Sequence, residues 1–113
     1  MTYIVKLTKK ALAEAEAYAQ YILDQSNDNM ASNKWWDGFL DPMFSLEALP
    51  GRCPLLPEGR YLRVEVRYLL YESHRLIFQI ERGEVQILRV YHASKKPLTK
   101  TALRKTMHRR SAS

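Results

Sequence analysis

The chain has 113 residues, enough for one compact domain with a hydrophobic core and too few for two ordinary domains. Hydrophobic residues make up 46% and charged residues 27%, which excludes the composition of a disordered chain. The formal net charge is +6, there is no acidic residue after Glu84, and the last 19 residues carry seven basic ones: Lys95, Lys96, Lys100, Arg104, Lys105, Arg109 and Arg110. A basic tail of this kind favours a polyanionic or acidic partner.

Several classes of protein are disfavoured by the residues that the chain lacks. No window approaches the roughly 18 apolar residues of a membrane span, and no charged leader precedes an apolar run, so we expect a cytoplasmic protein. The single cysteine, Cys53, has no second thiol for a disulfide or a Cys-rich metal site. There is no histidine pair at helical spacing and no glycine-rich phosphate loop, so we expect neither a metal nor a cofactor.

The N-terminal third of the sequence predicts a strand followed by a helix. Residues 3–7 alternate in character and include β-branched side chains, which predicts the strand. Thr8 then offers a hydroxyl to the free amide groups at a helix start. Apolar residues at helical spacing opposite acidic ones predict a helix over about residues 9–23. The polar run 24–29 predicts a turn, because its side chains compete for backbone hydrogen bonds.

A second helix is indicated by an apolar stripe with steps of four and three residues: Trp35, Phe39, Met43 and Leu46. Pro42 interrupts this stripe, because proline has no amide to bond the Gly38 carbonyl and its ring crowds the same oxygen. We therefore expect a kink or a break between Gly38 and Pro42.

The second half of the chain predicts strands. Residues 49–59 hold three prolines and two glycines, so they form a connection. Apolar segments follow at residues 61–71, 75–81 and 84–91, with Arg82-Gly83 as a two-residue hairpin signal. We predict an α+β fold with two helices on one face of a four-stranded sheet, in which the first strand joins a three-stranded antiparallel meander. The domain is expected to span residues 1–98, followed by a basic tail, 99–113, that is helical or disordered.

At this point the chain resembles the RelE/ParE superfamily of bacterial type II toxins, which includes proteins labelled plasmid stabilisation system proteins. The resemblance rests on the order of elements together with four strings: LPGRCPLLPE at residues 49–58, VEVRYLLY at 64–71, HRLIFQI at 74–80 and VQILRVYH at 85–92, followed by Lys95-Lys96. It covers roughly residues 3–98, and no one string carries it alone.

The resemblance implies a small toxin that inhibits growth and is neutralised by an antitoxin wrapping its surface. RelE-like members of the superfamily cleave messenger RNA on the ribosome, whereas ParE-like members poison DNA gyrase and are not known as enzymes. The chain departs from many relatives at Ser73-His74-Arg75, where they have Gly-Tyr-Arg, and at Lys95-Lys96, where they have arginines. Its basic extension after Pro97 is also longer than the ParE-like pattern.

Three arginines on neighbouring predicted strands are candidate phosphate- or partner-binding residues: Arg67, Arg75 and Arg89. They can converge on one phosphate, since a guanidinium group presents a fork of donors. The alternative is that each pairs with a nearby carboxylate, at Glu65, Glu72 or Glu81, and only keeps the sheet soluble.

His92 is the best acid/base candidate if the chain is a ribonuclease, with Arg75 and Arg89 as catalytic cations. A hydrogen-bonded structural histidine is the alternative. Lys95 and Lys96 are candidates for contact with an anionic partner. His74 is expected to serve only a hairpin turn, Cys53 to be a buried thiol, and Trp35 and Trp36 to belong to the core or an interface.

The hypothesis is a ParE-like toxin of a type II toxin-antitoxin system, with a cognate antitoxin and DNA gyrase as partners and operator DNA reached through the antitoxin complex. The first alternative is a ribosome-dependent messenger RNA endoribonuclease. The second is a non-toxic or decayed binding module. Whether the chain is an enzyme stays open between these functions.

Overall fold

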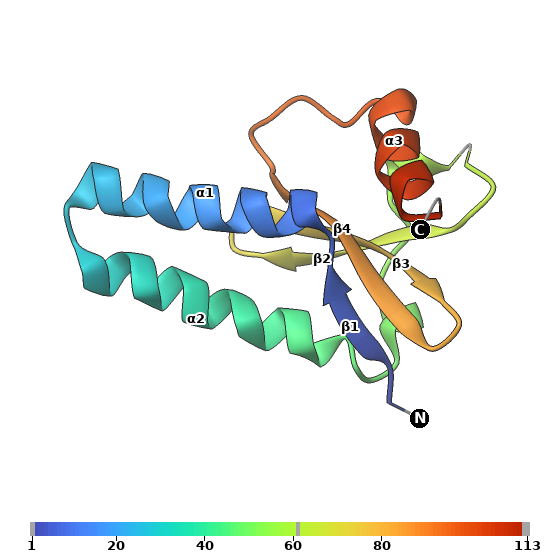
Figure 1. The fold of residues 1–113 in the computed structure, drawn as a ribbon, viewed down its shortest axis with the longest axis horizontal. Helices are drawn as coiled ribbons and strands as arrows, with labels where there is room; N and C mark the ends of the chain where they lie inside the picture. The colour runs from blue at the N-terminus through green and yellow to red at the C-terminus, as the bar shows by residue number, and fades with distance from the viewer. Residues whose placement is uncertain (1, 61, 112–113) are drawn as a thin grey trace.

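Four strands and three α-helices make up the described part of the chain, residues 2–60 and 62–111 of a computed structural model (Figure 1). The α-helices are α1 (Lys9–Ser26), α2 (Asn29–Ser45) and α3 (Lys100–Ser111), and the strands are β1 (Ile4–Leu7), β2 (Val66–Tyr71), β3 (His74–Glu81) and β4 (Glu84–His92). Two 3-10 turns, η1 (Pro50–Arg52) and η2 (Pro57–Gly59), lie between α2 and β2. None of the described helices is both long enough and apolar enough to cross a membrane.

The start of α1 follows the sequence prediction, and its end lies three residues further on. The Thr8 side chain accepts a hydrogen bond from the Ala11 amide at 3.1 Å, which caps the helix. The predicted turn is shorter than expected, because α1 continues to Ser26 and ends at Asn27 in the left-handed conformation. Asp28 then caps α2 by accepting from the Met30 amide at 2.9 Å.

Of the kink or break predicted between Gly38 and Pro42, the break does not occur, since α2 runs as one helix from Asn29 to Ser45 with Pro42 inside it. Proline inside a helix costs about 3 kcal/mol, whereas each large apolar side chain that is fully buried contributes about 1.5–3 kcal/mol. The helix buries Trp35 and Phe39 before the proline and Met43 after it. Burial of one continuous face therefore outweighs the lost hydrogen bond.

The sheet has the order β1-β4-β3-β2, with β1 parallel to β4 and the other neighbours antiparallel. The predicted fold class, an α+β arrangement with a four-stranded sheet, is confirmed. The predicted hairpin signal is also correct: Arg82 and Gly83 both have positive φ, at 48° and 79°, as a primed two-residue turn requires. The second strand is shorter than predicted and starts at Val66; residue 61 lies outside the described residues.

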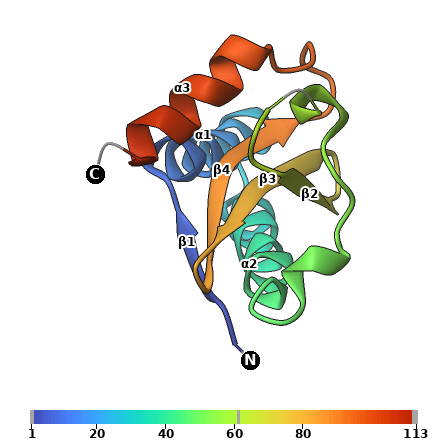
Figure 2. The same cartoon turned by 90° about the vertical axis from the view of Figure 1, so that its right-hand side faces the viewer.

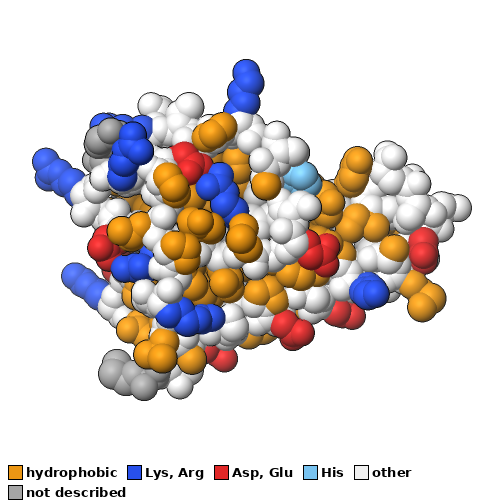
Figure 3. Space-filling view, turned by 180° about the vertical axis from the view of Figure 1, so that it is seen from behind, with side chains coloured by type: hydrophobic (Ala, Val, Ile, Leu, Met, Phe, Trp, Pro, Cys, Tyr) orange, Lys and Arg blue, Asp and Glu red, His pale blue; other side chains and the backbone are white. Residues whose placement is uncertain are grey.

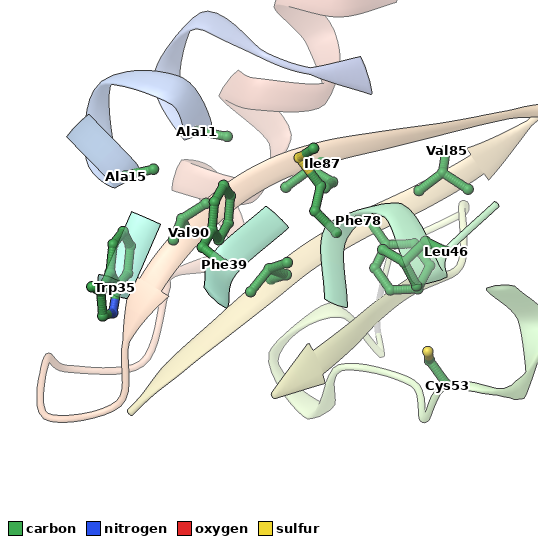
Figure 4. Packing of buried hydrophobic residues seen from close by; sticks show 12 residues of the cluster. Ala11, Ala15, Trp35, Phe39, Leu46, Cys53, Phe78, Val85, Ile87 and Val90 are labelled. Atoms are coloured by element: carbon green, nitrogen blue, oxygen red, sulfur yellow. The ribbon is translucent and has the colours of Figure 1, made fainter. Parts of the chain in front are cut away.

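The helices α1 and α2 pack on one face of the sheet, as predicted, and form an antiparallel pair that projects beyond it (Figures 1 and 2). Ala11 and Ala15 bring α1 close to the strands, because a small side chain allows a short approach. Phe39 of α2 lies against this layer and is fully buried (Figure 4). Phe78 and Ile87 supply the strand side of the same core (Figure 4).

The opposite face of the sheet is covered by the 49–65 connection and by α3. Leu56 and Leu103 are fully buried there against Ile77 and Leu88 of the central strands. Of the two conformations predicted for the tail, residues 100–111 adopt the helical one. The helix is held to the sheet through Leu103 and the preceding Leu98. Thr99 accepts from the Ala102 amide at 3.0 Å and caps the helix start.

Candidate functional site

Arg75 lies at the start of β3 and is held by a carboxylate from the connection. Its two terminal nitrogens donate to the two oxygens of Glu58 at 3.2 and 2.7 Å, and the side chains are only 18% and 15% exposed. Burial opposes ionisation of Glu58, but the hydrogen bond from Arg75 and neighbouring backbone amides outweigh it and lower the pKa of Glu58. The guanidinium also lies 5.7 Å from the centre of the Tyr68 ring. Arg75 is therefore a neutralised cation that ties the connection to the sheet.

Arg89 of β4 makes a second pair of this kind with Glu14 of α1. Its Nε and Nη2 atoms donate to the two carboxylate oxygens at 2.9 and 2.7 Å, and the side chains are 11% and 12% exposed. Glu14 Oε1 also accepts from the backbone amide of Val90 at 3.0 Å. The strand β1 ends at Leu7, opposite Ile87, so the Glu14 carboxylate takes the place of the missing strand partner beyond it.

Arg67 lies on the other face of the sheet from Arg75. On β2, Leu69 and Tyr71 pack with the α1/α2 core and Val66 and Tyr68 pack in the opposite core, which places Arg67 on the α1/α2 side. Arg75 is paired with Leu70 and therefore faces the opposite side. Arg67 donates to the Cys53 carbonyl at 2.6 Å and to Glu65 at 3.1 Å. The predicted convergence of the three arginines on one phosphate is therefore wrong, because the pleat separates two of them.

The alternative prediction, that each arginine pairs with a carboxylate, describes the structure better than convergence on one phosphate. Only one of the three carboxylates, however, was predicted from the sequence. Arg67 pairs with Glu65 as predicted, but Arg75 pairs with Glu58 and Arg89 with Glu14. Glu14 is 75 residues from Arg89 in the chain, so no local pattern pointed to it. The sequence signal for Glu58 was its place at the end of LPGRCPLLPE, residues 49–58, one of the strings that carry the family resemblance.

His74 was expected to serve a turn, and this is wrong, since it begins β3 and is 2% exposed. Its ring stands edge-on to Tyr18 at 4.3 Å and to Trp35 at 5.4 Å between centroids. Burial, followed by the neighbouring His92 and Lys95, lowers the pKa of His74 to about 4. Its Nδ1 atom has no hydrogen-bond partner, so His74 is a neutral core residue.

His92 lies beside His74, with 4.8 Å between ring centroids, and is tied to the turn that follows β4. Its Nδ1 atom accepts from the Ser94 amide at 3.0 Å and lies 2.6 Å from the Ser94 hydroxyl. The histidine is thus hydrogen-bonded within its own turn, as the structural interpretation predicted.

The turn at residues 93–97 is well anchored. Tyr91 donates its hydroxyl to the Lys96 carbonyl and lies under the Lys95 ammonium, 5.7 Å from the ring centre. The Ala93 amide donates to the Ser73 carbonyl at 2.7 Å. Both lysine side chains are exposed. The structure therefore presents Lys95 and Lys96 to the surroundings on a fixed backbone.

The remaining candidate residues belong to the interior. Cys53 is buried, and burial raises the pKa of its thiol despite Arg52 and Arg67 nearby. Trp35 is buried in the core as predicted, and Trp36 packs partly buried against it. Among residues 2–60 and 62–107, no group of three His, Cys, Asp or Glu side chains is placed to hold a metal ion.

Charge and apolar surface are separated along the molecule. The helical pair and its exit, residues 9–47, carry three lysines and seven carboxylates, whereas the other 15 basic residues lie in the sheet, its connections and α3. Figure 3 shows acidic side chains along the projecting helices, basic ones toward the α3 end and hydrophobic ones over the middle. The large apolar side chains with the highest exposed fractions are those of Met30, Leu49 and Leu70.

A family model described as "ParE toxin of type II toxin-antitoxin system, parDE" matches residues 5–97. The chain belongs to the ParE toxin family. The match runs from β1 through β4 and ends in the turn that carries Lys95 and Lys96, so α3 lies beyond it.

A solved structure described as "Chromosomal ParDE TA system from P. aeruginosa" has the same fold. The TM-score is 0.69 at 19% sequence identity, over 82% of this chain and 98% of that one. No curated protein matches the chain. Family and fold together identify a type II toxin of the ParE kind, which confirms the resemblance inferred from the strand strings.

Proposed function

We propose that this ParE family toxin arrests growth in the cytoplasm by binding DNA gyrase and stabilising its cleaved complex with DNA, and that a cognate antitoxin neutralises it by covering the same surfaces. Membership of the ParE family supports the toxin role. The gyrase target and the antitoxin contact are the parts that we add.

The observation that favours binding over RNA cleavage is the state of the arginines. A ribonuclease needs cations free to meet the negative charge that develops on the phosphorane, together with an acid and a base. Arg75 and Arg89 instead make bidentate pairs with Glu58 and Glu14, and the Nδ1 atom of His92 is occupied by Ser94. Freeing either arginine would leave a carboxylate unpaired in a nearly buried site, which costs about 3–5 kcal/mol.

The partner-facing surface that we assign is the exit of β4 together with Leu70 of β2, since the outer edge of β2 at residues 66–68 is paired with the connection. Lys95 and Lys96 are exposed on an anchored turn, and Leu70 is 61% exposed on the outermost strand. An interface that combines an exposed apolar side chain with exposed cations is the composition expected of a protein contact. In this assignment Arg67, Arg75 and Arg89 contribute to partner binding indirectly. Arg67 and Arg75 fix the connection to the sheet, and Arg89 fixes α1 to β4.

The experiment is a plasmid assay with purified toxin, DNA gyrase and ATP. Stoichiometric toxin is expected to reduce supercoiling and to yield linear plasmid after the gyrase is denatured. A second arm incubates the toxin with translating ribosomes and maps messenger RNA ends. Linear plasmid without new RNA ends supports the proposal, new RNA ends without linear plasmid support the endoribonuclease, and activity in neither arm supports the non-toxic binding module.

A matched pair of variants tests the assigned surface. Lys95→Gln with Lys96→Gln removes two exposed charges from it, and Lys34→Gln with Arg82→Gln removes two exposed charges elsewhere. We expect only the first variant to need roughly tenfold more toxin for the same linear product, as for the loss of about 1.4 kcal/mol of binding. Equal activity of the two variants would overturn the assignment of the turn.

A further inference from the structure

The helix α3 lies beyond the part of the chain that matches the ParE family, and three of the four exposed side chains among residues 100–107 are cationic. We infer that α3 and the 93–97 turn form a site for the phosphate backbone of duplex DNA. The side chains that carry it are Lys95, Lys96, Lys100, Arg104 and Lys105, all of them exposed. We call these five residues the cationic surface.

The cationic surface is rigid, because its apolar side is fastened to the sheet. Leu103 is fully buried against Ile77 and Leu88 of the sheet, and Leu98, just before the helix, is buried in the same cluster. The Tyr91 hydroxyl holds the Lys96 carbonyl at the other end of the surface. Cations that are already ordered lose less conformational entropy on binding than cations on a disordered tail.

Lys100, in the first turn of α3, does not stabilise the helix through its macrodipole. A helix gains from acidic residues in its first turn, where the macrodipole is positive, and loses from cations there. The helix α3 has no acidic residue in its first turn and begins with Lys100. No acid follows Glu84 anywhere in the sequence, so the positive potential of this surface is not offset by carboxylates of its own segment. An anionic partner would offset it.

The lack of an apolar anchor favours DNA over an acidic protein segment. Protein interfaces are built around buried aromatic or aliphatic anchors, whereas phosphate contacts need only cations and amides. Within residues 91–107, no large hydrophobic side chain is among the exposed ones, which lie instead on β1, the helical pair, the connection and β2. Binding through such a surface is independent of base sequence, since nothing in it is arranged to read base edges.

This inference does not rest on the gyrase proposal, because it concerns the isolated toxin. The probe is a fluorescent duplex of about 20 base pairs of mixed sequence, titrated with the full chain at about 50 to 200 mM NaCl. Neutralisation of five phosphates gives a slope of log Kobs against log[NaCl] of about −4.5, a roughly 500-fold loss of affinity over that range.

The decisive variant is Arg104→Gln with Lys105→Gln. The matched control is Lys34→Gln with Arg82→Gln, which removes two positive charges as well and so has the same net charge as the decisive variant. We expect the first variant to shift the slope to about −2.7 and the control to keep the slope of the unmodified chain. Thermal unfolding checks that both variants are folded, as expected for exposed positions. Equal slopes for the two variants would overturn the site.

A polyglutamate peptide of the same charge as the duplex tests the alternative partner. Tight binding to DNA with little binding to the peptide supports the inference. Equal or tighter binding to the peptide would overturn the assignment to DNA and indicate an acidic protein segment. Loss of DNA binding in the α3 variant with gyrase poisoning intact would leave the proposed function standing and separate the two proposals.

Discussion

His74 should make the toxin lose stability in mild acid, because its imidazole is buried in the neutral form. Burial, with His92 and Lys95 nearby, lowers the pKa of His74 to about 4, whereas an exposed imidazole titrates near 6.5. Above about pH 6.5 both the folded and unfolded states are neutral at this residue, and its contribution to stability is fully present. As the pH falls, the unfolded chain takes up the proton first, so stability is lost until about pH 4.

The size of the loss follows from the difference in pKa. About 2.5 pKa units at 1.36 kcal/mol each give about 3.4 kcal/mol for the whole titration, of which about 2.5 kcal/mol is lost by about pH 4.5. The assay is urea unfolding of the unmodified toxin and His74→Phe at about pH 7.5 and about pH 4.5. Phenylalanine keeps the ring contacts with Tyr18 and Trp35 and carries no proton.

The comparison between the two proteins isolates His74 from the other acid-sensitive groups. Glu58 also has a lowered pKa and loses stability in acid, but it does so equally in both proteins. We expect the difference in free energy of unfolding to shift by about 2.5 kcal/mol in favour of His74→Phe on going to the lower pH. Parallel loss of stability in the two proteins would refute a buried neutral imidazole.

Three other substitutions test individual contacts. Glu14→Gln should cost about 3 kcal/mol in urea unfolding by leaving Arg89 unpaired, and adding Arg89→Met should recover part of it; no recovery would contradict the charge explanation. Gly38→Ala should destabilise the toxin, since the new Cβ would lie 2.4 Å from the Tyr71 hydroxyl. The same substitution should cost less in a Tyr71→Phe background, because that hydroxyl is gone and alanine favours a helix over glycine by about 1 kcal/mol. Thermal melts of the four proteins measure this coupling, and additive effects would contradict the contact. Leu103→Ala should cost about 2–4 kcal/mol and open α3 to proteolysis, whereas a helix that stays protected would contradict its anchoring.

The parts of the fold that sequence predicts well are those set by local chemistry. Thr8 caps α1 and Arg82-Gly83 turns the β3–β4 hairpin because each needs only its neighbours in the chain. The break predicted near Pro42 is wrong for the opposite reason. The cost of a proline is local, whereas the burial of Trp35 and Met43 on either side of it depends on the whole sheet.

The candidate site was harder to predict because its pairs are distant in sequence. Arg75 and Arg89 stand out in the sequence as cations within apolar strands, but their partners come from η2 and α1. His74 follows a turn in the sequence, and only the packing of α1 and α2 over the start of β3 makes it a core residue. The sequence also left α3 open between helix and disorder, since the burial of Leu103 depends on the far face of the sheet.

The central claim, that this ParE family toxin acts by trapping gyrase on DNA, is tested most directly inside the cell. After induction, covalent gyrase–DNA complexes are captured and counted, and messenger RNA ends are mapped from the same cultures. The account predicts that covalent complexes accumulate before growth stops and that co-expression of the cognate antitoxin abolishes them. New messenger RNA ends at regular codon positions, with no rise in covalent complexes, would contradict it.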